Sequence, residues 1–342
     1  LVVAKEVRRV ENGAFHNSKL SELVFDEYPK GDENYGRPLL EIGRGEECEV
    51  DSASSLYCVA GGNSSLSAIH LPSHLKMLGV ACFDSLSADV YFNMDAHLKS
   101  IGGGAFQYCY ITRLELPAVD YLGIGAFLET ALTSITFHPN STFTEMPEYM
   151  LAYSYDLVKI EIPACVRIIG QEAFTECASL TNITFAEGCV LEAIQTGAFA
   201  GTAITNFVMP ETVTEVEEDA FNCPSLETIT LSRNLKTASS GSKGMFYNCA
   251  KLKAIYVPEE SPYLKTVDGV LYDKAQTIVY CFPQGKDPAG FVLPDTVITI
   301  EGYAFYKYSG SSIVFPESLE VIEQNAFRYA KLKSIHIPKN VK

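Results

Sequence analysis

Residues Ile168–Phe185 read IIGQEAFTECASLTNITF, and close variants of this stretch recur along the chain. The most regular element is the pair Ala173-Phe174 or an apolar substitute for it. The second residue of this anchor pair falls at 15, 83, 106, 127, 151, 174, 199, 221, 246, 305 and 327. The gaps are 68, 23, 21, 24, 23, 25, 22, 25, 59 and 22 residues, so eight of the ten lie between 21 and 25. Such a period is typical of a solenoid of stacked repeats.

Each anchor pair lies inside a longer pattern. Val-x-x-Ile-Gly-x-x-Ala-Phe leads up to it, as in Val166–Phe174, and Cys-x-x-Leu-x-x-Ile-x-Ile-Pro follows it. The alternating end of the pattern predicts a short strand in which Ile183 and Phe185 face one way and Thr184 the other. A proline then ends the strand, because it has no N–H to donate to a sheet. These prolines are Pro72, Pro117, Pro163, Pro210, Pro258, Pro294, Pro316 and Pro338.

The anchor pair has a plain packing role. Phe fills the core, and Ala is small where the backbone turns, so Cys82, Met150-Leu151 and Met245-Phe246 are acceptable apolar substitutes. One repeat cannot bury its apolar face alone, whereas stacked repeats can, because each strand pairs with the next. We therefore predict a β-rich repeat solenoid over residues 1–342. One short strand per repeat joins a continuous parallel sheet, with short turns or helical turns on the other side.

The chain has 10 cysteines, too low a density for a disulfide scaffold. Four of them lie two or three residues after an anchor, where small thiols would pack inside the solenoid and bond nearby backbone. We expect buried free thiols at Cys109, Cys177, Cys223 and Cys249. The disulfide state of two further pairs stays open, and these are Cys48 with Cys58 and Cys165 with Cys189.

The complete repeat, L-x-x-I-x-I-P-x-x-V-x-x-I-G-x-x-A-F-x-x-C, resembles the leucine-rich repeat of BspA-like surface proteins, a Treponema-type repeat of about 23 residues. The segment Ser261–Lys286 also resembles the hairpin insertion common between repeats of that family. The resemblance implies a right-handed leucine-rich repeat coil. It further implies a bacterial cell-surface or secreted protein whose export signal is not in this chain. Some relatives are adhesins that bind host extracellular-matrix or plasma proteins.

The first departure from the period is an irregular acidic insertion at residues 26–62. Its core, Asp26–Asp51, is rich in acidic residues but lacks the spacing of a calcium-binding loop. We interpret Leu39–Gly43 as one degenerate repeat with Glu46-Glu47 in place of the anchor pair. The chain also begins and ends inside a repeat, so we expect the solenoid to be truncated at both ends.

The second departure is a β-hairpin insertion at residues 259–290. Asp268-Gly269 between two β-rich runs is a strong signal for a two-residue hairpin turn. A third strand is expected at Thr277–Cys281, and the stack is expected to resume at Phe291–Pro294. This insertion accounts for the 59-residue gap between anchors.

The composition excludes several function classes. With 42 acidic and 26 basic residues the net charge is −16, which disfavours nucleic acid and anionic membrane surfaces. No apolar run approaches the roughly 20 residues of a membrane helix. The histidines show no metal-ligand spacing, and we interpret His70 and His74 as surface residues. Gly102–Gly104 fits the ordinary repeat, and no nucleophile motif is present. We expect no cofactor, no metal and no enzyme activity.

The outward positions of the strands form the surface most open to a partner. The middle position of each strand runs His70, Tyr91, Glu115, Thr136, Glu161, Thr184, Val208, Thr230, Tyr256, Val314, His336. The position two residues earlier runs Ala68, Asp89, Arg113, Ser134, Lys159, Asn182, Asn206, Thr228, Ala254, Ser312, Ser334. The larger side chains here are our candidate partner-binding residues, and they are Tyr91, Arg113, Glu115, Lys159, Glu161, Tyr256 and His336.

Two functions fit this pattern. The first is a surface binding or adhesion module that presents the strand face to a protein or glycan ligand, including a host extracellular-matrix protein. The alternative is a structural spacer that holds another domain away from the cell surface. The sequence leaves the ligand and the oligomeric state open.

Overall fold

The computed structural model describes residues 1–35, 37, 40–43, 58–60, 65–238 and 244–342. The chain forms two compact units, Leu1–Cys189 and Val190–Lys342, which are taken here one at a time. Each unit is a parallel β-solenoid, and no α-helix occurs in the residues that the structure describes. One turn of the solenoid, which corresponds to one sequence repeat, is called a coil below.

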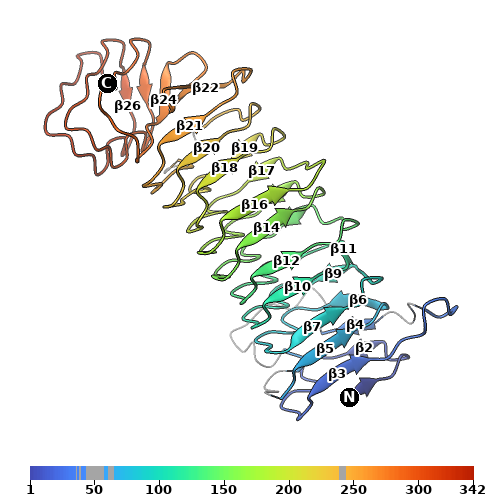
Figure 1. Cartoon of the computed structure of the whole chain (residues 1–342). Helices are drawn as coiled ribbons and strands as arrows, with labels where there is room; N and C mark the ends of the chain where they lie inside the picture. The colour runs from blue at the N-terminus through green and yellow to red at the C-terminus, as the bar shows by residue number, and fades with distance from the viewer. Residues whose placement is uncertain (36, 38–39, 44–57, 61–64, 239–243) are drawn as a thin grey trace. The chain divides into compact units, whose positions relative to one another are not determined.

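In the first unit, the Ile-x-Ile position of each coil forms a strand, as the alternating pattern predicts. Figure 1 shows these strands as successive rungs of a ladder. Their register confirms the outward columns, since His70 pairs with Tyr91, Arg113 with Ser134 and Glu161 with Thr184. The row consists of β1 (Val2–Val3), β3 (Glu22–Phe25), β5 (Ala68–Leu71), β7 (Asp89–Phe92), β10 (Arg113–Glu115), β12 (Ser134–Thr136), β14 (Lys159–Ile162) and β16 (Asn182–Phe185).

A second row of short strands lies at the Val-x-x-Ile position of the coils, where the sequence predicted only turns. Gly170 shows how closely neighbouring coils approach there, because a Cβ on it would lie 2.8 Å from the backbone oxygen of Met146. This close approach explains the glycine in the Ile-Gly motif. The row consists of β2 (Arg9–Val10), β4 (Leu40–Ile42), β6 (Leu75–Leu78), β8 (His97–Leu98), β9 (Ser100–Ile101), β11 (Ala118–Val119), β13 (Glu145–Met146) and β15 (Ile168–Ile169).

The second unit repeats this arrangement. Its strand face is a three-stranded parallel sheet of β18 (Asn206–Val208), β20 (Thr228–Thr230) and β21 (Ala254–Tyr256). Val208, Thr230 and Tyr256 lie side by side, as the outward column predicts. The second row contains β17 (Ala193–Ile194), β19 (Glu215–Val216), β25 (Thr299–Ile300) and β26 (Val321–Ile322).

The predicted hairpin is present in the second unit. Strands β22 (Leu264–Val267) and β23 (Val270–Asp273) are antiparallel and joined by Asp268-Gly269, whose φ angles are 48° and 74°. Two positive φ values are what a type I′ turn requires, which explains the Asp-Gly pair. The third strand, β24 (Ile278–Cys281), pairs antiparallel with β23 and parallel with β25.

The stack resumes earlier than the sequence indicated. The backbone N–H of Phe282 donates to the oxygen of Ala304 (2.7 Å), and its ring stacks on Phe305 at 5.7 Å. Cys281-Phe282 is therefore a further anchor pair, 23 residues before Phe305. The sequence contained the evidence for this anchor, because the same Cys-Phe pair, Cys82-Phe83, was already recognised as an anchor pair. The third strand of the insertion thus belongs to a coil of its own.

The anchors carry the core and the backbone hydrogen bonds between coils. Phe83, Phe106 and Phe127 are fully buried, and neighbouring rings lie 5.4 Å apart. In most coils the anchor N–H donates to the residue before the next anchor, as from Phe83 to Ala105 and from Phe127 to Met150. The residues at positions −2 and +2 from the anchor donate in the same way, as from Gly104 to Ile124 and from Tyr108 to Leu128.

The same positions adopt a left-handed backbone. Position −2 has a positive φ at all eleven anchors recognised in the sequence, in Gly13, Ala81, Gly104, Gly125, Tyr149, Glu172, Gly197, Asp219, Gly244, Tyr303 and Asn325. Position +2 does so in Asn17, Ser85, Tyr108, Glu129, Tyr153, Glu176, Gly201, Asn248, Lys307 and Tyr329. Most of these residues carry a Cβ, which costs about 1–2 kcal/mol each in this conformation. The fold therefore stores local strain at most anchor turns, the Phe199 turn with Gly197 and Gly201 being an exception.

The cysteine column is confirmed. Each thiol donates to the carbonyl oxygen of the anchor one coil earlier, with Sγ–O distances of 2.7 to 3.1 Å, in Cys109, Cys177, Cys223 and Cys249. Ser154 fills the equivalent place with its hydroxyl on Phe127. Burial raises the pKa of the Cys177 and Cys223 thiols to about 12. These thiols are structural donors and remain protonated near neutral pH.

The other cysteines are also free thiols where the structure describes them. Cys165 and Cys189 do not form a disulfide, and Cys58 is a buried thiol. Cys48 lies outside the described residues. Cys58–Ala60 occupies the anchor place between its neighbours in the first unit, because Phe15 N–H donates to Val59 O and Val59 N–H donates to Cys82 O. This segment stands between those two anchors, whereas Glu46-Glu47, interpreted from the sequence as a replaced anchor pair, lie outside the described residues.

Part of the acidic insertion is anchored to the coils. Leu40–Ile42 pairs as β4 in the second row, so the degenerate repeat read at Leu39–Gly43 does contribute a strand. The Glu27 carboxylate accepts hydrogen bonds from the Ser73 N–H (2.6 Å) and the Asn93 side chain (2.7 Å). Asp95 accepts from Lys30 and Tyr35 at 2.6 and 2.7 Å.

The left-handed positions give a test of the fold. Glu172→Gly should raise the free energy of unfolding by about 0.5–1 kcal/mol, because glycine adopts a positive φ without steric cost. Gly125→Ala should lower it by about 1 kcal/mol, since the added Cβ meets only ordinary contacts but the φ of 60° becomes strained. Urea unfolding measures both. The control is Glu187→Gly, which should lower the free energy of unfolding because the φ of Glu187 is not positive. If Glu172→Gly also lowers the free energy of unfolding, Glu172 is not strained by its left-handed backbone.

Thiol labelling tests the cysteine column. In a Cys48→Ser background at pH 8, a thiol-reactive disulfide reagent should modify half-exposed Cys165 well before Cys177, whose raised pKa leaves little thiolate. Mass spectrometry of peptides after timed quenching identifies the order, and denaturant should make all remaining thiols react. Labelling of Cys177 as fast as Cys165 in the native protein would contradict a closed core.

Candidate functional site

The strand face of the first unit is a stack of aligned side chains. Backbone hydrogen bonds join Thr133 to Thr112, Val158 to Thr133 and Thr181 to Val158 at 2.8 to 3.2 Å. The strands that begin directly after Thr112, Thr133, Val158 and Thr181 are therefore in register over four neighbouring coils. This places Arg113, Ser134, Lys159 and Asn182 in one column and Glu115, Thr136, Glu161 and Thr184 in the next.

A hollow of about 890 Å³ lies over β12, β14 and β16. Its floor is the sheet, with Thr136, Lys159 and Glu161 among the side chains that line it. Its wall comes from the turns that follow the strands, where the chain leaves the sheet. The wall residues are His138, Pro139, Pro163, Ala164, Cys165, Ala186 and Glu187.

A second hollow of about 410 Å³ adjoins it over β10 and β12. The two share Ser134, Thr136 and Lys159, so they form one continuous depression that we call the strand-face groove. Arg113 and Glu115 line its smaller part, and Glu161 lines its larger part. The groove thus brings together four of the seven candidate residues.

The charges of the groove have no partners within the part of the chain that the structure describes. Arg113, Glu115, Lys159 and Glu161 are all exposed, and none makes an ion pair or side-chain hydrogen bond with a described residue. Other charged side chains of the unit are paired, as in Lys30–Asp95 at 2.6 Å and Arg9–Glu41 at 2.8 Å. The groove therefore presents two cations and two anions with their donors and acceptors free for a ligand.

Tyr91 lies on the same face of this unit but does not line the groove. It is 51% exposed, and its ring stacks on His70 with centroids 5.0 Å apart. Its hydroxyl contacts Asp89 at 3.4 Å, and His70 contacts Glu22 at 3.0 Å. Tyr91 is thus part of a local cluster whose polar groups already have partners.

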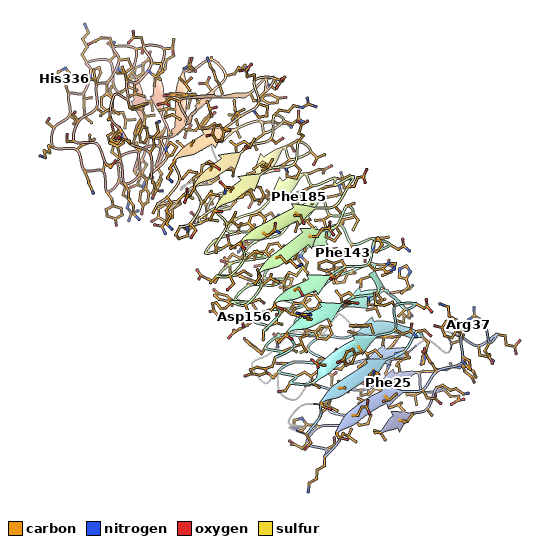
Figure 2. The ribbon with its side chains drawn as sticks, viewed as in Figure 1. Phe25, Arg37, Phe143, Asp156, Phe185 and His336 are labelled. Atoms are coloured by element: carbon orange, nitrogen blue, oxygen red, sulfur yellow. The ribbon has the colours of Figure 1, made fainter. Side chains whose placement is uncertain are left out.

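The two remaining candidates lie in the second unit and are not brought together there. Tyr256 is 51% exposed on β21, where it follows Thr230 in the outward column. His336 is exposed in the last coil, outside any strand (Figure 2). Neither residue lines a described hollow of the strand face.

The turn residues of the groove wall were missed by sequence reasoning. The prolines were interpreted only as strand ends, although Pro163 also starts a turn whose residues line the groove, with the Val166 N–H donating to the Pro163 oxygen. Figure 2 labels Phe143 and Phe185 in this part of the molecule, and Phe143 packs against Phe137 of the groove at 5.4 Å. The usable signal was the polar residue soon after each strand, such as His138 or Glu187.

The titratable groups near the groove do not form a catalytic arrangement. Burial raises the pKa of the Cys165 thiol, and no hydrogen bond joins it to His138. The prediction that His74 lies at the surface is wrong, because this side chain is only 2% exposed, and its burial lowers its pKa.

Across the described residues, no group of three or more His, Cys, Asp and Glu side chains is placed to hold a metal ion. Within the same residues, no helix is long and apolar enough to span a membrane.

Sequence comparison supports the fold and the repeat together. A family model described as the BspA-type leucine-rich repeat region, in six copies, matches residues 57–160, 144–267 and 278–342. The chain belongs to this family. The matched residues contain the anchor pairs from Phe83 onward and the strands that follow them on the strand face, which confirms the resemblance and the solenoid fold. Among curated proteins, none matches significantly.

Two solved structures resemble the chain in fold. A leucine-rich repeat protein from Bacteroides ovatus superposes with a TM-score of 0.65 at 21% identity, over 100% of this chain and 82% of that one. The pneumococcal vaccine antigen PcpA superposes with a TM-score of 0.55 at 22% identity, over 81% of this chain. The chain spans 62% of the length of that antigen. At these identities the likeness establishes the leucine-rich repeat fold.

Proposed function

We propose that this protein is a non-enzymatic binding module, displayed at the cell surface or secreted, that holds a protein or glycan partner in the strand-face groove. The observation that carries the proposal is the set of four unpartnered charges, Arg113, Glu115, Lys159 and Glu161, around a groove of about 890 Å³ and its smaller extension. A rigid sheet holds these side chains in two fixed columns, so a ligand meets a preorganised charge pattern.

Other observations support a surface role. Leucine-rich repeat domains generally present their strand surface to partners, and PcpA, which shares the fold, is a vaccine antigen. The net charge of −16 disfavours polyanions as partners. A host extracellular-matrix protein offers the mixed charges that two cations and two anions would match.

Binding assays with groove variants test this function. Immobilised fibronectin, laminin and collagen, together with a glycan array, should include at least one ligand that the wild-type protein binds. The double variant Arg113→Gln/Lys159→Gln should weaken that binding at least tenfold, because a hydrogen bond to a charged group contributes about 1.5–3 kcal/mol. Surface plasmon resonance provides the dissociation constants.

The matched control carries the same charge change away from the groove. Arg8→Gln/Lys99→Gln removes two exposed cations that do not line it, and this variant should bind as the wild type does. Equal weakening by both double variants would mean that only net charge matters. Absence of binding across the whole panel would instead favour a spacer role.

A further inference from the structure

Four tyrosines gather on the anchor-turn edge of the second unit. Tyr247, Tyr303, Tyr306 and Tyr329 come from three anchor turns, with ring centroids 4.7 to 5.8 Å apart. Tyr329 is 63% exposed, Tyr247 and Tyr303 are half-buried, and Tyr306 lies beneath them. Tyr303 and Tyr329 hold left-handed positions, which turn them to the outside of the coils.

Two cations lie in the same cluster. The Arg328 guanidinium donates to the hydroxyls of Tyr303 (3.1 Å) and Tyr329 (3.3 Å) and lies 5.0 Å from the Tyr329 ring centroid. Lys307 donates to the Asn248 side chain at 2.7 Å and lies 5.1 Å from the Tyr306 ring centroid. Lys307 N–H also donates to Arg328 O at 3.0 Å, so the two residues are neighbours across adjacent coils. We call these six side chains the tyrosine–cation patch.

Within the described residues, the hydrogen-bond partners of these two cationic side chains are neutral groups, namely two tyrosine hydroxyls and an asparagine side chain. Lys253 and Lys286 of the same unit pair with carboxylates, on Glu227 and Asp268, both at 2.8 Å. Within the described residues Arg328 and Lys307 have no carboxylate partner. Hydrogen bonds and ring contacts fix their positions while leaving their charge uncompensated and part of their N–H donors unused.

We propose that the tyrosine–cation patch binds a glycan whose terminal sugar carries a carboxylate. A carboxylate matches the paired donors of a guanidinium and the point charge of an ammonium. The C–H face of a sugar ring packs on aromatic rings, and phenol hydroxyls can bond its hydroxyl rim. A single carboxylated sugar also fits the charge balance, because a net charge of −16 would repel a long polyanion from a patch of only two cations.

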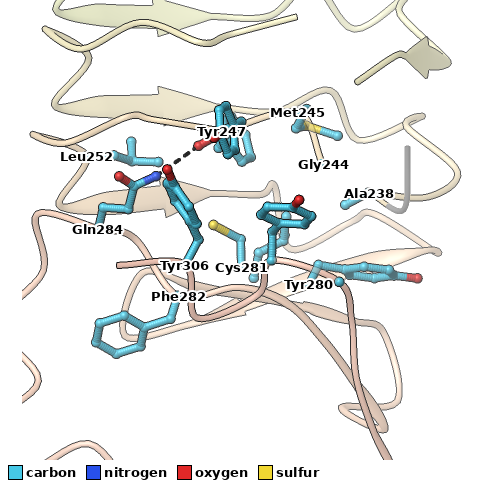
Figure 3. A pocket seen from close by; sticks show the side chains of 14 residues that line it. Ala238, Gly244, Met245, Tyr247, Leu252, Tyr280, Cys281, Phe282, Gln284 and Tyr306 are labelled. Atoms are coloured by element: carbon cyan, nitrogen blue, oxygen red, sulfur yellow. Dashed lines mark hydrogen bonds between the residues drawn. The ribbon is translucent and has the colours of Figure 1, made fainter. Parts of the chain in front are cut away.

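A small cavity lies behind the patch and is not the proposed site. Its volume is about 30 Å³, which has room for a water but not for a sugar. Figure 3 shows Tyr247 and Tyr306 joined by a hydrogen bond beside Gln284. The Gln284 Oε1 is buried without a partner, as expected of a group that bonds a trapped water. The Tyr247 and Tyr306 rings line this cavity on one side. The ligand would lie on the outer surface of the patch.

Calorimetric titration with defined oligosaccharides tests the proposal. Sialyllactose and a glucuronic-acid-terminated disaccharide are the acidic probes, and lactose is the neutral one. At least one acidic probe should bind saturably, with a dissociation constant on the order of 1 mM or tighter, and lactose should bind at least tenfold more weakly. Arg328→Gln should weaken acidic-sugar binding about tenfold or more, and Lys236→Gln, an exposed lysine with no described part in the patch, should not.

Other outcomes would overturn the assignment. If neither acidic probe binds, or if Arg328→Gln binds like the wild type, the patch is not this site. Tighter binding of a tetraglutamate peptide or an oligothymidylate would assign it to an acidic peptide or to nucleic acid instead. Because the patch lies in the second unit and on turns, failure here would leave the groove of the first unit unaffected. Unchanged thermal unfolding of Arg328→Gln excludes a folding defect.

Discussion

The interaction on which each unit depends is the backbone hydrogen-bond ladder at the anchor turns. Three N–H groups of a turn, at positions −2, 0 and +2, donate to the next coil, as in Gly125, Phe127 and Glu129. Alternating left-handed residues aim these donors along the stack rather than within the coil. A positive φ costs steric energy in residues with a Cβ. Without it, several peptide N–H groups of the buried turn would lack hydrogen-bond partners, which costs more. The aromatic column then fills the space that the turn encloses.

Much of this fold was predictable from the sequence. The period, the strand at the Ile-x-Ile position, the Asp-Gly hairpin and the cysteine column all rest on local patterns, and the structure confirms them. The second row of strands was not predictable, because a two-residue strand such as β15 has no periodicity of its own. Cys281-Phe282 was missed because the preceding hairpin hides the spacing. Cys58–Ala60 could not be found either, since its anchor role depends on backbone contacts with Phe15 and Cys82.

The candidate site was only partly visible in the sequence. Period-2 alternation identifies which residues face outward, and the strand register agrees with it for Arg113, Glu115, Lys159 and Glu161. It cannot tell whether a charged side chain has a partner, and it does not reveal that turns after the strands enclose a groove. The same limit applies to Tyr91, whose contacts with His70 and Asp89 arise between coils or across the strand. The tyrosine–cation patch lies on turns, where positive φ values decide which side chains point outward.

These observations separate two sets of residues in the first unit. The anchors and their ladder hold the coils together, whereas the groove residues lie on a surface that the fold does not need. This separation permits ligand specificity to change without loss of the solenoid, because surface substitutions usually alter stability by less than about 0.5 kcal/mol. The central claim is therefore that the groove charges serve binding and contribute little to folding.

Urea unfolding of two variants tests that claim most directly. The quadruple variant Arg113→Gln/Glu115→Gln/Lys159→Gln/Glu161→Gln should unfold within about 1 kcal/mol of the wild type. Phe127→Ala, which removes one buried anchor ring, should lose about 3–5 kcal/mol. A quadruple variant destabilised as much as Phe127→Ala would show that the groove charges hold the fold, and would contradict the account.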